Sequence, residues 1–452
     1  MTTGQARPAE SGRLAAWLKS WEAYRDRRVL AVLLLGFASG LPILLVGSTL
    51  SAWLREAEVS RSGIGLFAYV FAPYTLKFAW APLMDRLALP PFTSWLGRRR
   101  GWMLATQIGL LLAILGLAQT SPATGLAATA IMALLVAFFS ASQDIVIDAY
   151  RVEILPEEKL GAGAGVVVLG YRVGMWVAGA GTLFAAEAAG WTMAYSMVAG
   201  FVLVGMATVL LIEEPAASRD ALPSGLQRPK EWLRDAVIEP FADFFARHGV
   251  RVALVILAFI SLYKASDVLL MLMTNPFYLD IGFSKGDIAE VSGTFGIFAT
   301  IAGGLAGGML VFRMGILPSL LVAGVLQAAS NLMFAALAVI GPSKGFFYLT
   351  VMVENLTGGM GTSAFVAYLS SLCNLHYTAV QYALLTSFMQ MLGKYVIVPM
   401  SGFYADWLGT WELFFVTSTL FSLPGLLLVL YLQRRLRIER APAPPLGQRV
   451  AG

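Results

Sequence analysis

Long apolar stretches recur along almost the whole chain, and they constrain its fold more than any other feature. A membrane-spanning helix needs about 20 consecutive, predominantly apolar residues. Only 13% of the residues are charged and 58% are hydrophobic, whereas soluble domains have about 25% and about 45–50%. The sequence therefore predicts an all-α membrane protein with twelve spans, at residues 29–54, 63–84, 101–119, 124–149, 161–187, 191–213, 250–279, 288–312, 316–340, 345–372, 379–406 and 411–433.

Basic residues are distributed very unevenly between the predicted loops. With the N-terminus in the cytoplasm, the inside segments hold 24 of the 32 lysines and arginines, and the outside loops hold four. Cytoplasmic loops are enriched in these residues, so both termini are predicted to be cytoplasmic. Residues 1–28 lack the apolar stretch and cleavage site of a signal peptide, and we interpret them as a cytoplasmic lead-in.

The longest connection between predicted spans divides them into two groups of six. It contains an amphipathic stretch, "EWLRDAVIEPFADFFARHG", which is expected to lie on the inner membrane surface. The predicted parts of the chain are an N-terminal cytoplasmic segment (1–28), a first bundle (29–213), a linker (214–249), a second bundle (250–433) and a basic tail (434–452).

The two halves carry related loop sequences. The second span ends in "APLMDR", followed by "GRRRG", and the eighth ends in "GGMLVFRMG". These strings resemble the loop signature of the major facilitator superfamily, although the second copy has Phe312 where the signature has an acid. The resemblance implies two six-helix bundles with a substrate cavity near the middle of the membrane.

Ionisable residues inside the predicted spans are few, since a charge at the centre of a spanning helix costs about 2.5–3.5 kcal/mol. At a rise of about 1.5 Å per residue, Arg172, Lys264 and Lys394 lie near mid-membrane, where the acids are Asp267 and Glu354. An unpaired cation is expensive in low dielectric, so we hypothesise a cationic cavity that selects an anionic substrate. Structural ion pairs, or one lysine held neutral by burial, are the alternatives.

A second group of charges lies toward the predicted cytoplasmic ends of spans two to four. In "SASQDIVIDAYR", Asp144, Asp148 and Arg151 share one helical stripe. Asp144 is the deeper acid and is a candidate for proton coupling or for pairing with Lys77. Asp148 is predicted to bridge to Arg151 or to the basic cluster after span two. Such a bridge holds one state of a two-state carrier, and the predicted conformational latch comprises Asp85, Arg86, Arg98, Arg99, Arg100, Asp148 and Arg151.

Polar side chains within the spans are candidates for contacts with protons and substrate. Carboxylates surrounded by hydrocarbon favour the protonated form, so Asp267 and Glu354, followed by Asp144, are predicted to carry protons. The glycine-rich string "ENLTGGMGTSAF" in span ten predicts a bent or broken helix. Trp176, Tyr263 and Tyr395 either stack on sugar rings or serve packing. The candidate hydrogen-bonding residues for a substrate are Tyr171, Asn355, Gln390 and Gln143.

Longer strings carry a narrower resemblance. They are "SASQDIVIDAYRVEILPEEKLGAGAGVVVLGYRVGM", "GRRRGWMLATQ", "LYKASDVLLMLMTNPF", "ENLTGGMGTSAFVAYLSSLCN" and "QYALLTS". All closely resemble the corresponding regions of the bacterial muropeptide permeases, the AmpG family, and the resemblance covers about residues 30–430.

The resemblance implies a carrier in the inner membrane of a Gram-negative bacterium. Its substrates would be N-acetylglucosaminyl-1,6-anhydro-N-acetylmuramyl peptides, imported from periplasm to cytoplasm by alternating access and driven by the proton gradient. It also implies a role in peptidoglycan recycling and, in many relatives, in the induction of a chromosomal beta-lactamase, and so in antibiotic resistance.

Other functions remain open at the level of sequence. An acetyl-CoA transporter of the same superfamily also handles an anion, and a lipid flippase needs a lateral opening that a sequence does not reveal. A nucleophile–base pair, a set of metal ligands and a phosphate-cradling loop are all missing from the sequence, so an enzyme, a metal and a cofactor are not predicted. The expected partners are the anionic sugar-peptide, protons and membrane lipids, without nucleic acid, and the expected state is a monomer.

Overall fold

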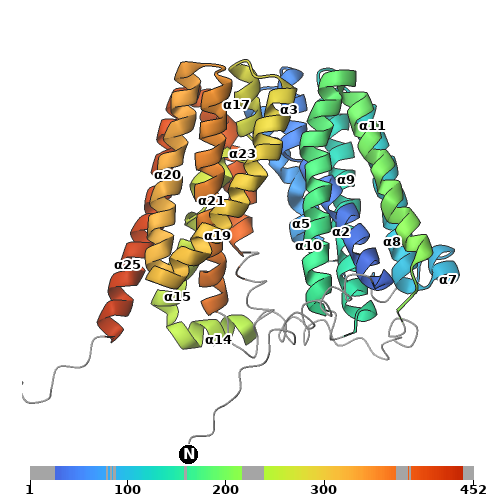
Figure 1. Cartoon of the computed structure of the whole chain (residues 1–452), viewed down its shortest axis with the longest axis horizontal. Coiled ribbons are helices and arrows are strands. Elements are labelled where there is room, and N and C mark those ends of the chain that lie inside the picture. The colour runs from blue at the N-terminus through green and yellow to red at the C-terminus, as the bar shows by residue number, and fades with distance from the viewer. Residues whose placement is uncertain are drawn as a thin grey trace, which may run out of the picture. The chain divides into compact units, whose positions relative to one another are not determined.

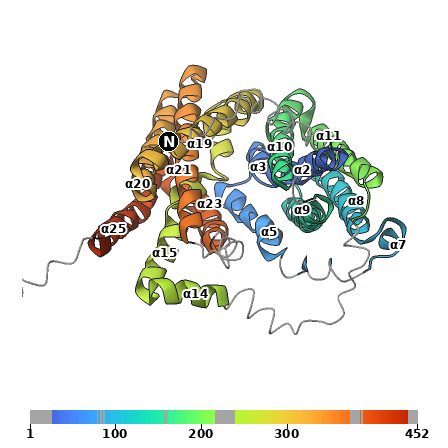
Figure 2. The ribbon, with the colours of Figure 1, turned by 60° about the horizontal axis from the view of Figure 1, so that its bottom comes forward.

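The computed structural model describes residues 26–77, 80–81, 84, 88–156, 160–215, 239–372, 385 and 388–440. Every regular element in these ranges is a helix, as the apolar stretches predict. The chain divides into two compact units. The first comprises Met1–Val59 and Val70–Gly225, and the second comprises Ser60–Tyr69 and Leu226–Gly452. Within each unit the long helices run side by side (Figures 1 and 2).

The first unit contains the helices of spans one to six, apart from the start of span two. In chain order they are α2 (Arg27–Leu45), α3 (Ser48–Glu56), α5 (Ala72–Leu76), α7 (Phe92–Leu96), α8 (Arg98–Ala118), α9 (Leu126–Ile154), α10 (Leu160–Trp176), the π-helical turn η5 (Val177–Gly181) and α11 (Thr182–Leu211). Gly190 interrupts α11 with a φ of 81° and so separates spans five and six.

The second unit begins with a segment of span two, α4 (Arg61–Leu66) and the first part of η2 (Phe67–Phe71). The remaining elements are α14 (Glu239–His248), α15 (Val250–Leu262), α16 (Ala265–Leu270), α17 (Thr274–Asp280), α18 (Lys285–Ile288), η7 (Ala289–Phe295), α19 (Gly296–Met314), α20 (Ile316–Ile340), α21 (Lys344–Leu372), η8 (Gly393–Ile397), α23 (Val398–Leu408), α24 (Trp411–Ser418), η9 (Thr419–Ser422) and α25 (Leu423–Arg440).

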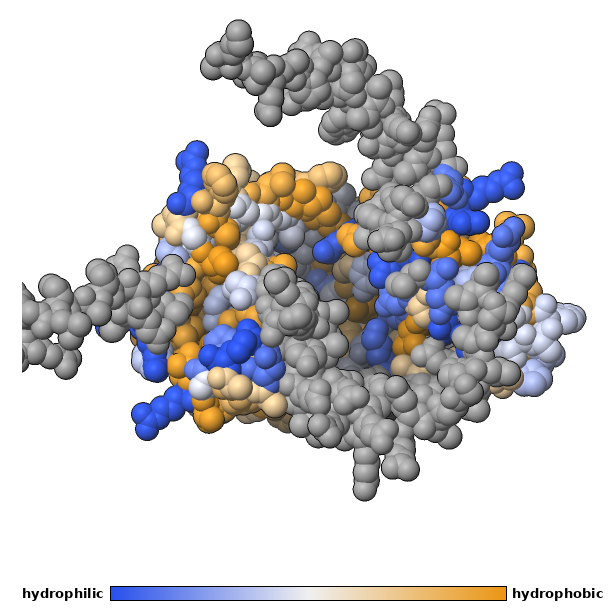
Figure 3. All heavy atoms as spheres, turned by 90° about the horizontal axis from the view of Figure 1, so that it is seen from below, coloured by the Kyte–Doolittle hydropathy of each residue, from blue (hydrophilic) through white to orange (hydrophobic). Residues whose placement is uncertain are grey.

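Large apolar side chains lie on the surface of both units (Figure 3). Phe312 is 91% exposed and Leu211 is 85% exposed. Among the described residues, eight helical stretches are long and apolar enough to cross a membrane, and one of them, Val166–Leu211, contains two of the predicted spans. A surface of this kind is suited to lipid rather than to water.

Glycines determine how closely two pairs of helices approach. In the first unit, a Cβ on Gly40 of α2 would overlap the carbonyl group of Tyr171 on α10, and a Cβ on Gly174 would overlap the Phe37 carbonyl of α2. In the second unit, Gly303 of α19 lies in the same way against the Leu356 carbonyl of α21. Small residues allow membrane helices to pack backbone against backbone. These glycines therefore set the close spacing of α10 against α2 and of α21 against α19.

The prediction of a broken helix in span ten is wrong. α21 runs without interruption from Lys344 to Leu372, through all of the glycines in "ENLTGGMGTSAF". The reason is packing, because Gly359 lies against the backbone of α19 at Thr300 and Gly303, where a side chain would not fit. The string therefore codes for a close helix contact, which the glycines make possible without breaking the helix.

The irregular points of the spans lie elsewhere. Span seven breaks at Tyr263 and Lys264, between α15 and α16. Spans five, eight and eleven each contain a π-helical turn, η5, η7 and η8 respectively. Such turns are rare and occur frequently at functional sites. Two of the three predicted mid-membrane cations lie at these irregularities, Lys264 at the break and Lys394 within η8.

Candidate substrate and proton pathway

Asp144 lies at the centre of a polar cluster inside the first unit. The Ser39 hydroxyl of α2 donates a hydrogen bond of 2.5 Å to the Asp144 carboxylate on α9. Lys77, the candidate partner of Asp144, lies at the end of α5, close enough for its charge to attract this carboxylate. The Tyr171 hydroxyl on α10 also lies near Asp144. Three helices of one unit, α2, α5 and α10, thus contribute polar groups around one half-buried carboxylate of α9.

The neighbours of this cluster have different environments. Arg172 follows Tyr171 on α10 but is exposed, on a stripe that also includes Val168, Val173 and Trp176. Gln143 is fully buried, and its amide donates to the Ala38 carbonyl at 2.9 Å. The position of Gln143 favours a role in holding α9 against α2, whereas the Arg172 side chain is exposed.

In the second unit, the break in span seven exposes an ion pair. The Lys264 ammonium donates to the Asp267 carboxylate at 2.8 Å, and it also contacts the Thr362 hydroxyl of α21 at 3.4 Å. Tyr263 does not face solvent, because it stacks on Phe365 and donates to the Leu320 carbonyl at 2.8 Å. The predicted i,i+3 relation of Lys264 and Asp267 is therefore realised as a direct salt bridge.

A small cavity adjoins this ion pair. It has a volume of about 10 Å³ and is lined by Lys264 and Asp267 together with Ser266, Gln327, Ser422 and others. The side-chain oxygen of Gln327 is buried, without a hydrogen-bond partner in the described residues. A space of this size holds about one water molecule, which needs polar partners of this kind. The surroundings of the pair can therefore hold about one water molecule.

Glu354 lies on α21 and belongs to the same polar region. The Asn355 amide donates to the Glu354 carboxylate at 2.8 Å, and the Thr300 hydroxyl of α19 donates to the Asn355 oxygen at 2.8 Å. The charges of Lys264 and Asp267 both act on Glu354. Of the predicted hydrogen-bonding residues, Asn355 is therefore engaged with a carboxylate that was itself predicted to carry protons.

Lys394 and Gln390 lie on the eleventh span, both half-buried. A Cβ on Gly393, next to Lys394, would lie 3.2 Å from Val268 of α16, which is the neighbour of Asp267 in the chain. The backbone of η8 thus approaches the segment that carries the ion pair. Tyr395 of the same turn lies beside Tyr69, with ring centroids 6.5 Å apart.

The predicted latch residues are only partly described, since Asp85 and Arg86 lie outside the described residues. Arg99 is buried, and its guanidinium bonds to Glu153 at 2.6 Å. The guanidinium of Arg100 donates to the carbonyls of Val209 and Leu210 at the end of α11, at 2.9 Å each.

The start of α8, which carries the three latch arginines, is also held by contacts within the first unit. Glu214 accepts hydrogen bonds from the backbone N–H groups of Arg99 and Arg100 and so caps α8. Arg98 is half-buried at the start of the same helix. Asp148 lies 3.7 Å from Arg151 and is mostly exposed, so of the two partners predicted for it, the described geometry favours Arg151.

A further charge cluster in the second unit was not found from the sequence. Arg61 of α4 lies 3.3 Å from Asp280 and has its guanidinium 4.1 Å from the Trp411 ring centroid. The backbone N–H of Ser62 donates to Asp406 at 2.9 Å. The sequence did contain a signal for this cluster. Arg61 precedes span two, Asp280 follows span seven and Asp406 ends span eleven, and all three positions are predicted to lie on the same side of the membrane.

Two helical units, each with partly buried carboxylates and cations among its spans, are the arrangement expected of a membrane carrier. Residues 29–396 match the model of the Major Facilitator Superfamily. The chain is 41% identical to the anhydromuropeptide permease of Escherichia coli K12, over 92% of this chain and 82% of that protein. It is 34% identical to a putative transporter, AmpG 3, of Rickettsia prowazekii, over 88% of this chain and 94% of the relative.

Solved structures show the same fold at low sequence identity. The nucleoside transporter NupG aligns with a TM-score of 0.66 at 14% identity, over 91% of this chain and 99% of that one. A peptide transporter, POT, in complex with sulfate aligns with a TM-score of 0.67 at 12% identity, over 91% and 95% of the two chains. The chain belongs to the major facilitator superfamily and, within it, to the AmpG family of transporters. It is a multi-pass inner membrane protein.

Proposed function

We propose that the chain imports anhydromuropeptides from periplasm to cytoplasm, coupled to protons, for the recycling of peptidoglycan. The observation that carries this proposal is the 41% identity with the E. coli anhydromuropeptide permease along most of both chains. The substrate crosses the membrane chemically unchanged, so the protein acts as a carrier and not as an enzyme. A carrier of this superfamily binds its substrate near mid-membrane and opens to each side in turn.

The cations provide the affinity for the substrate. These peptides carry carboxylates, and a carboxylate forms strong charge-assisted hydrogen bonds with lysine and arginine. Lys264 is supported best, because its ammonium lies at a helix break beside a polar cavity. The exposure of Arg172 supports its accessibility to a substrate. Lys394 is assigned the same role from its π-helical turn.

Proton coupling follows from competition for Lys264. A substrate carboxylate that binds this ammonium displaces Asp267, which then lacks a counter-ion. A carboxylate that loses a neighbouring positive charge is more readily protonated. Binding of one substrate carboxylate is thereby linked to uptake of one proton. Glu354 acts as the neighbouring acceptor in the second unit, and Asp144 serves the first unit in the same way.

The topology and assembly complete the proposal. Both termini lie in the cytoplasm, which places 24 of the 32 basic residues on the inner side. The transporting bundles are residues 29–213 and 250–433, joined by the linker 214–249 and flanked by segments 1–28 and 434–452. The protein works as a monomer, surrounded by membrane lipids.

Reconstitution into proteoliposomes tests this function. Radiolabelled N-acetylglucosaminyl-anhydro-N-acetylmuramyl tripeptide is offered outside, with the lumen at pH 7.5 and the exterior at pH 6.0 or 7.5. We expect saturable uptake that accumulates only with the pH gradient, together with acidification of the lumen during uptake. Labelled acetyl-CoA and a fluorescent phospholipid are the comparison substrates. Transport of either one without muropeptide uptake would overturn the proposal.

A further inference from the structure

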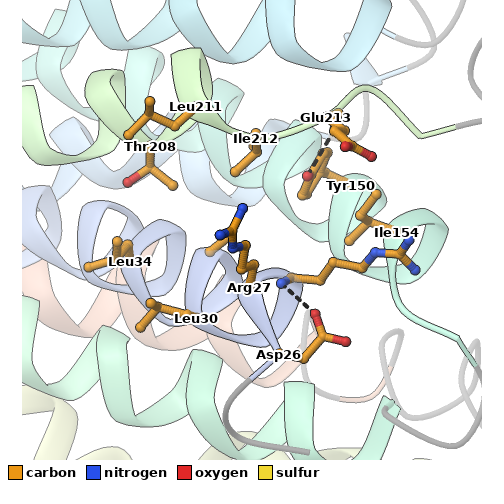
Figure 4. A pocket seen from close by; sticks show the side chains of 12 residues that line it. Asp26, Arg27, Leu30, Leu34, Tyr150, Ile154, Thr208, Leu211, Ile212 and Glu213 are labelled. Carbon is orange, nitrogen blue, oxygen red and sulfur yellow. Dashed lines mark hydrogen bonds between the residues drawn. The ribbon is translucent and has the colours of Figure 1, made fainter.

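A cavity of about 810 Å³ opens at one end of the first unit, where α2 begins and where α9 and α11 end (Figure 4). α2 packs against both of the other helices. The cavity therefore forms where three helices of a single unit diverge, and it is separate from the polar cluster around Asp144. Its walls are Asp26, Arg27, Arg28, Leu30, Ala31, Leu34, Tyr150, Ile154, Thr208, Leu211, Ile212 and Glu213.

Two cations border this cavity. The guanidinium of Arg27 projects into it toward α11 (Figure 4), and both Arg27 and Arg28 are exposed. Within the described part of the chain, neither guanidinium has a recorded hydrogen bond or ion pair. The nearby Asp26 carboxylate caps α2 by accepting a hydrogen bond from the backbone N–H of Arg28 at 2.8 Å. Arg27 is thus directed at a space that a polar ligand can enter, and Arg28 lines the same space.

The other walls combine four polar residues, Asp26, Tyr150, Thr208 and Glu213, with an apolar side formed by leucines, isoleucines and Ala31. Leu30 is 51% exposed and Leu211 is 85% exposed. Arg27, Leu30 and Leu34 lie on one face of α2, at spacings of three and four residues. A ligand that follows this face meets guanidinium groups first and a hydrocarbon surface next. This sequence of environments is complementary to an anionic head group attached to an acyl chain.

We propose that this cavity binds one anionic phospholipid of the cytoplasmic leaflet. Its phosphate contacts Arg27 and Arg28, since arginine matches the geometry of phosphate oxygens. One acyl chain lies along Leu30, Leu34 and Leu211. Basic pockets between spanning helices on the cytoplasmic side suit such head groups. The assignment to this leaflet rests on the orientation given under the proposed function, whereas the chemistry of the site does not.

The position of the site gives it a consequence for transport. α2 carries Ser39 and α9 carries Asp144, and these two residues share the hydrogen bond at the centre of the first unit. A lipid that contacts the ends of both helices stabilises their spacing. Anionic lipid in the bilayer is therefore expected to raise the activity of the carrier.

Native mass spectrometry of the purified full-length protein tests the site. Phosphatidylglycerol and phosphatidylcholine are titrated separately, and bound lipid is counted. We expect one phosphatidylglycerol to bind about tenfold tighter than phosphatidylcholine, because the choline group of phosphatidylcholine places a positive charge next to its phosphate and is repelled by the two arginines. The double substitution Arg27→Gln with Arg28→Gln should abolish this preference. The double substitution Arg251→Gln with Arg313→Gln removes the same charge from exposed positions elsewhere and should preserve it.

A second pair of variants tests the apolar part without changing any charge. Leu30→Trp fills the cavity, whereas Leu254→Trp places the same side chain on α15 at a site of similar exposure, 54%. We expect only Leu30→Trp to lose the bound lipid while both variants keep the melting temperature of the wild type. Equal binding by both variants, or a wild type without preference for the anionic lipid, overturns the proposal.

The competing occupant is residues 1–25 of the same chain, which immediately precede the cavity. Incorporation of p-benzoylphenylalanine at position 30, followed by irradiation in mixed-lipid vesicles, separates the two. The proposal is supported if the cross-linked phospholipids contain a higher proportion of phosphatidylglycerol than the vesicles do. A cross-link to a peptide from residues 1–25 overturns it. These readouts measure binding alone, so their failure is distinguishable from a failure of muropeptide uptake.

Discussion

The ammonium of Lys264 lies 2.8 Å from the carboxylate of Asp267, at the point where span seven changes from α15 to α16. Both side chains are only partly exposed, at 18% and 25%. The pair satisfies itself while no substrate is present. A carboxylate-bearing substrate must therefore take Lys264 away from Asp267, and this exchange is the step at which binding and proton uptake are connected.

Replacing only Lys264 should have a different effect from replacing both Lys264 and Asp267. Lys264→Gln leaves Asp267 without its counter-ion, so we expect a lower melting temperature and a loss of uptake of at least about tenfold, the equivalent of about 1.4 kcal/mol. The double variant Lys264→Gln with Asp267→Asn should recover the melting temperature, because no charge remains unpaired, but should not recover uptake. Differential scanning fluorimetry and proteoliposome uptake measure the two effects. Recovery of both would show that the pair is only structural.

Asp144 and Asp148 are one helical turn apart but should behave differently. Asp144 is held by Ser39 next to Lys77, whereas the side chain of Asp148 is 62% exposed. We expect Asp144→Asn to abolish accumulation driven by the pH gradient and to retain exchange of substrate without a gradient, because exchange needs no net proton transfer. Asp148→Asn is the control and should retain both activities. Normal accumulation by Asp144→Asn would remove Asp144 from the proton pathway.

Two adjacent glycines of α19 provide a matched test of helix packing. A Cβ on Gly303 would overlap the Leu356 carbonyl of α21, whereas a Cβ on Gly304 meets no atom within 4 Å. Gly303→Ala should therefore separate the helices and destabilise the protein by about 1–3 kcal/mol, the usual effect of overpacking. Gly304→Ala should be neutral. The yield of monodisperse protein and its melting temperature report the difference, and equal effects would contradict the packing of α19 on α21.

Arg61 should control the attachment of α4 to α23. Its guanidinium contacts Asp280, the Trp411 ring and the Ala405 carbonyl, and Gly65 of α4 packs against the backbone of α23. We expect Arg61→Gln to speed hydrogen–deuterium exchange in residues 60–69 by about tenfold, since a hydrogen bond to a charged group is worth about 1.5–3 kcal/mol. Arg55→Gln changes the same charge on α3 and should not have this effect. Unchanged exchange in Arg61→Gln would exclude the attachment.

The helical architecture was predictable because span length and apolar composition follow from the thickness of the bilayer. The positions at which the helices within the spans break or pack closely were not predictable. The glycines of span ten were interpreted as a break, but an isolated string does not reveal that Gly359 faces the backbone of α19. Conversely, the break at Lys264 has no glycine or proline to mark it, and the contacts of Tyr263 with Phe365 and Leu320 beside the break come from distant parts of the chain.

The sequence identified the charged residues of the candidate site, because charges are rare in apolar spans. It did not identify the side chains that these residues contact, and those contacts decide their roles. Lys264, Asp267, Glu354 and Asp144 stand out as ionisable residues in apolar spans, and their partners Thr362, Asn355 and Ser39 lie on other helices or nearby in the chain. The Arg98–Arg100 cluster illustrates the limit. Its sequence predicts a gating latch, and the structure adds that Arg99 and Arg100 form bonds within the first unit. These bonds are tertiary contacts that the sequence does not reveal, and the latch stays a prediction.

Glu153 provides the test that separates these two roles for Arg99. Its carboxylate lies 2.6 Å from the buried guanidinium of Arg99, within the first unit. Because Arg99 is only 5% exposed, Glu153→Gln should weaken the compensation of a buried charge, and removal of such a partner is destabilising by up to about 3–5 kcal/mol. We expect a lower melting temperature and a lower yield, with uptake per folded molecule and its pH dependence unchanged. Glu58→Gln, an exposed acid on the loop after α3, is the control and should change neither quantity. If Glu153→Gln instead altered the transport rate of fully stable protein, Arg99 would act in gating as the sequence predicts.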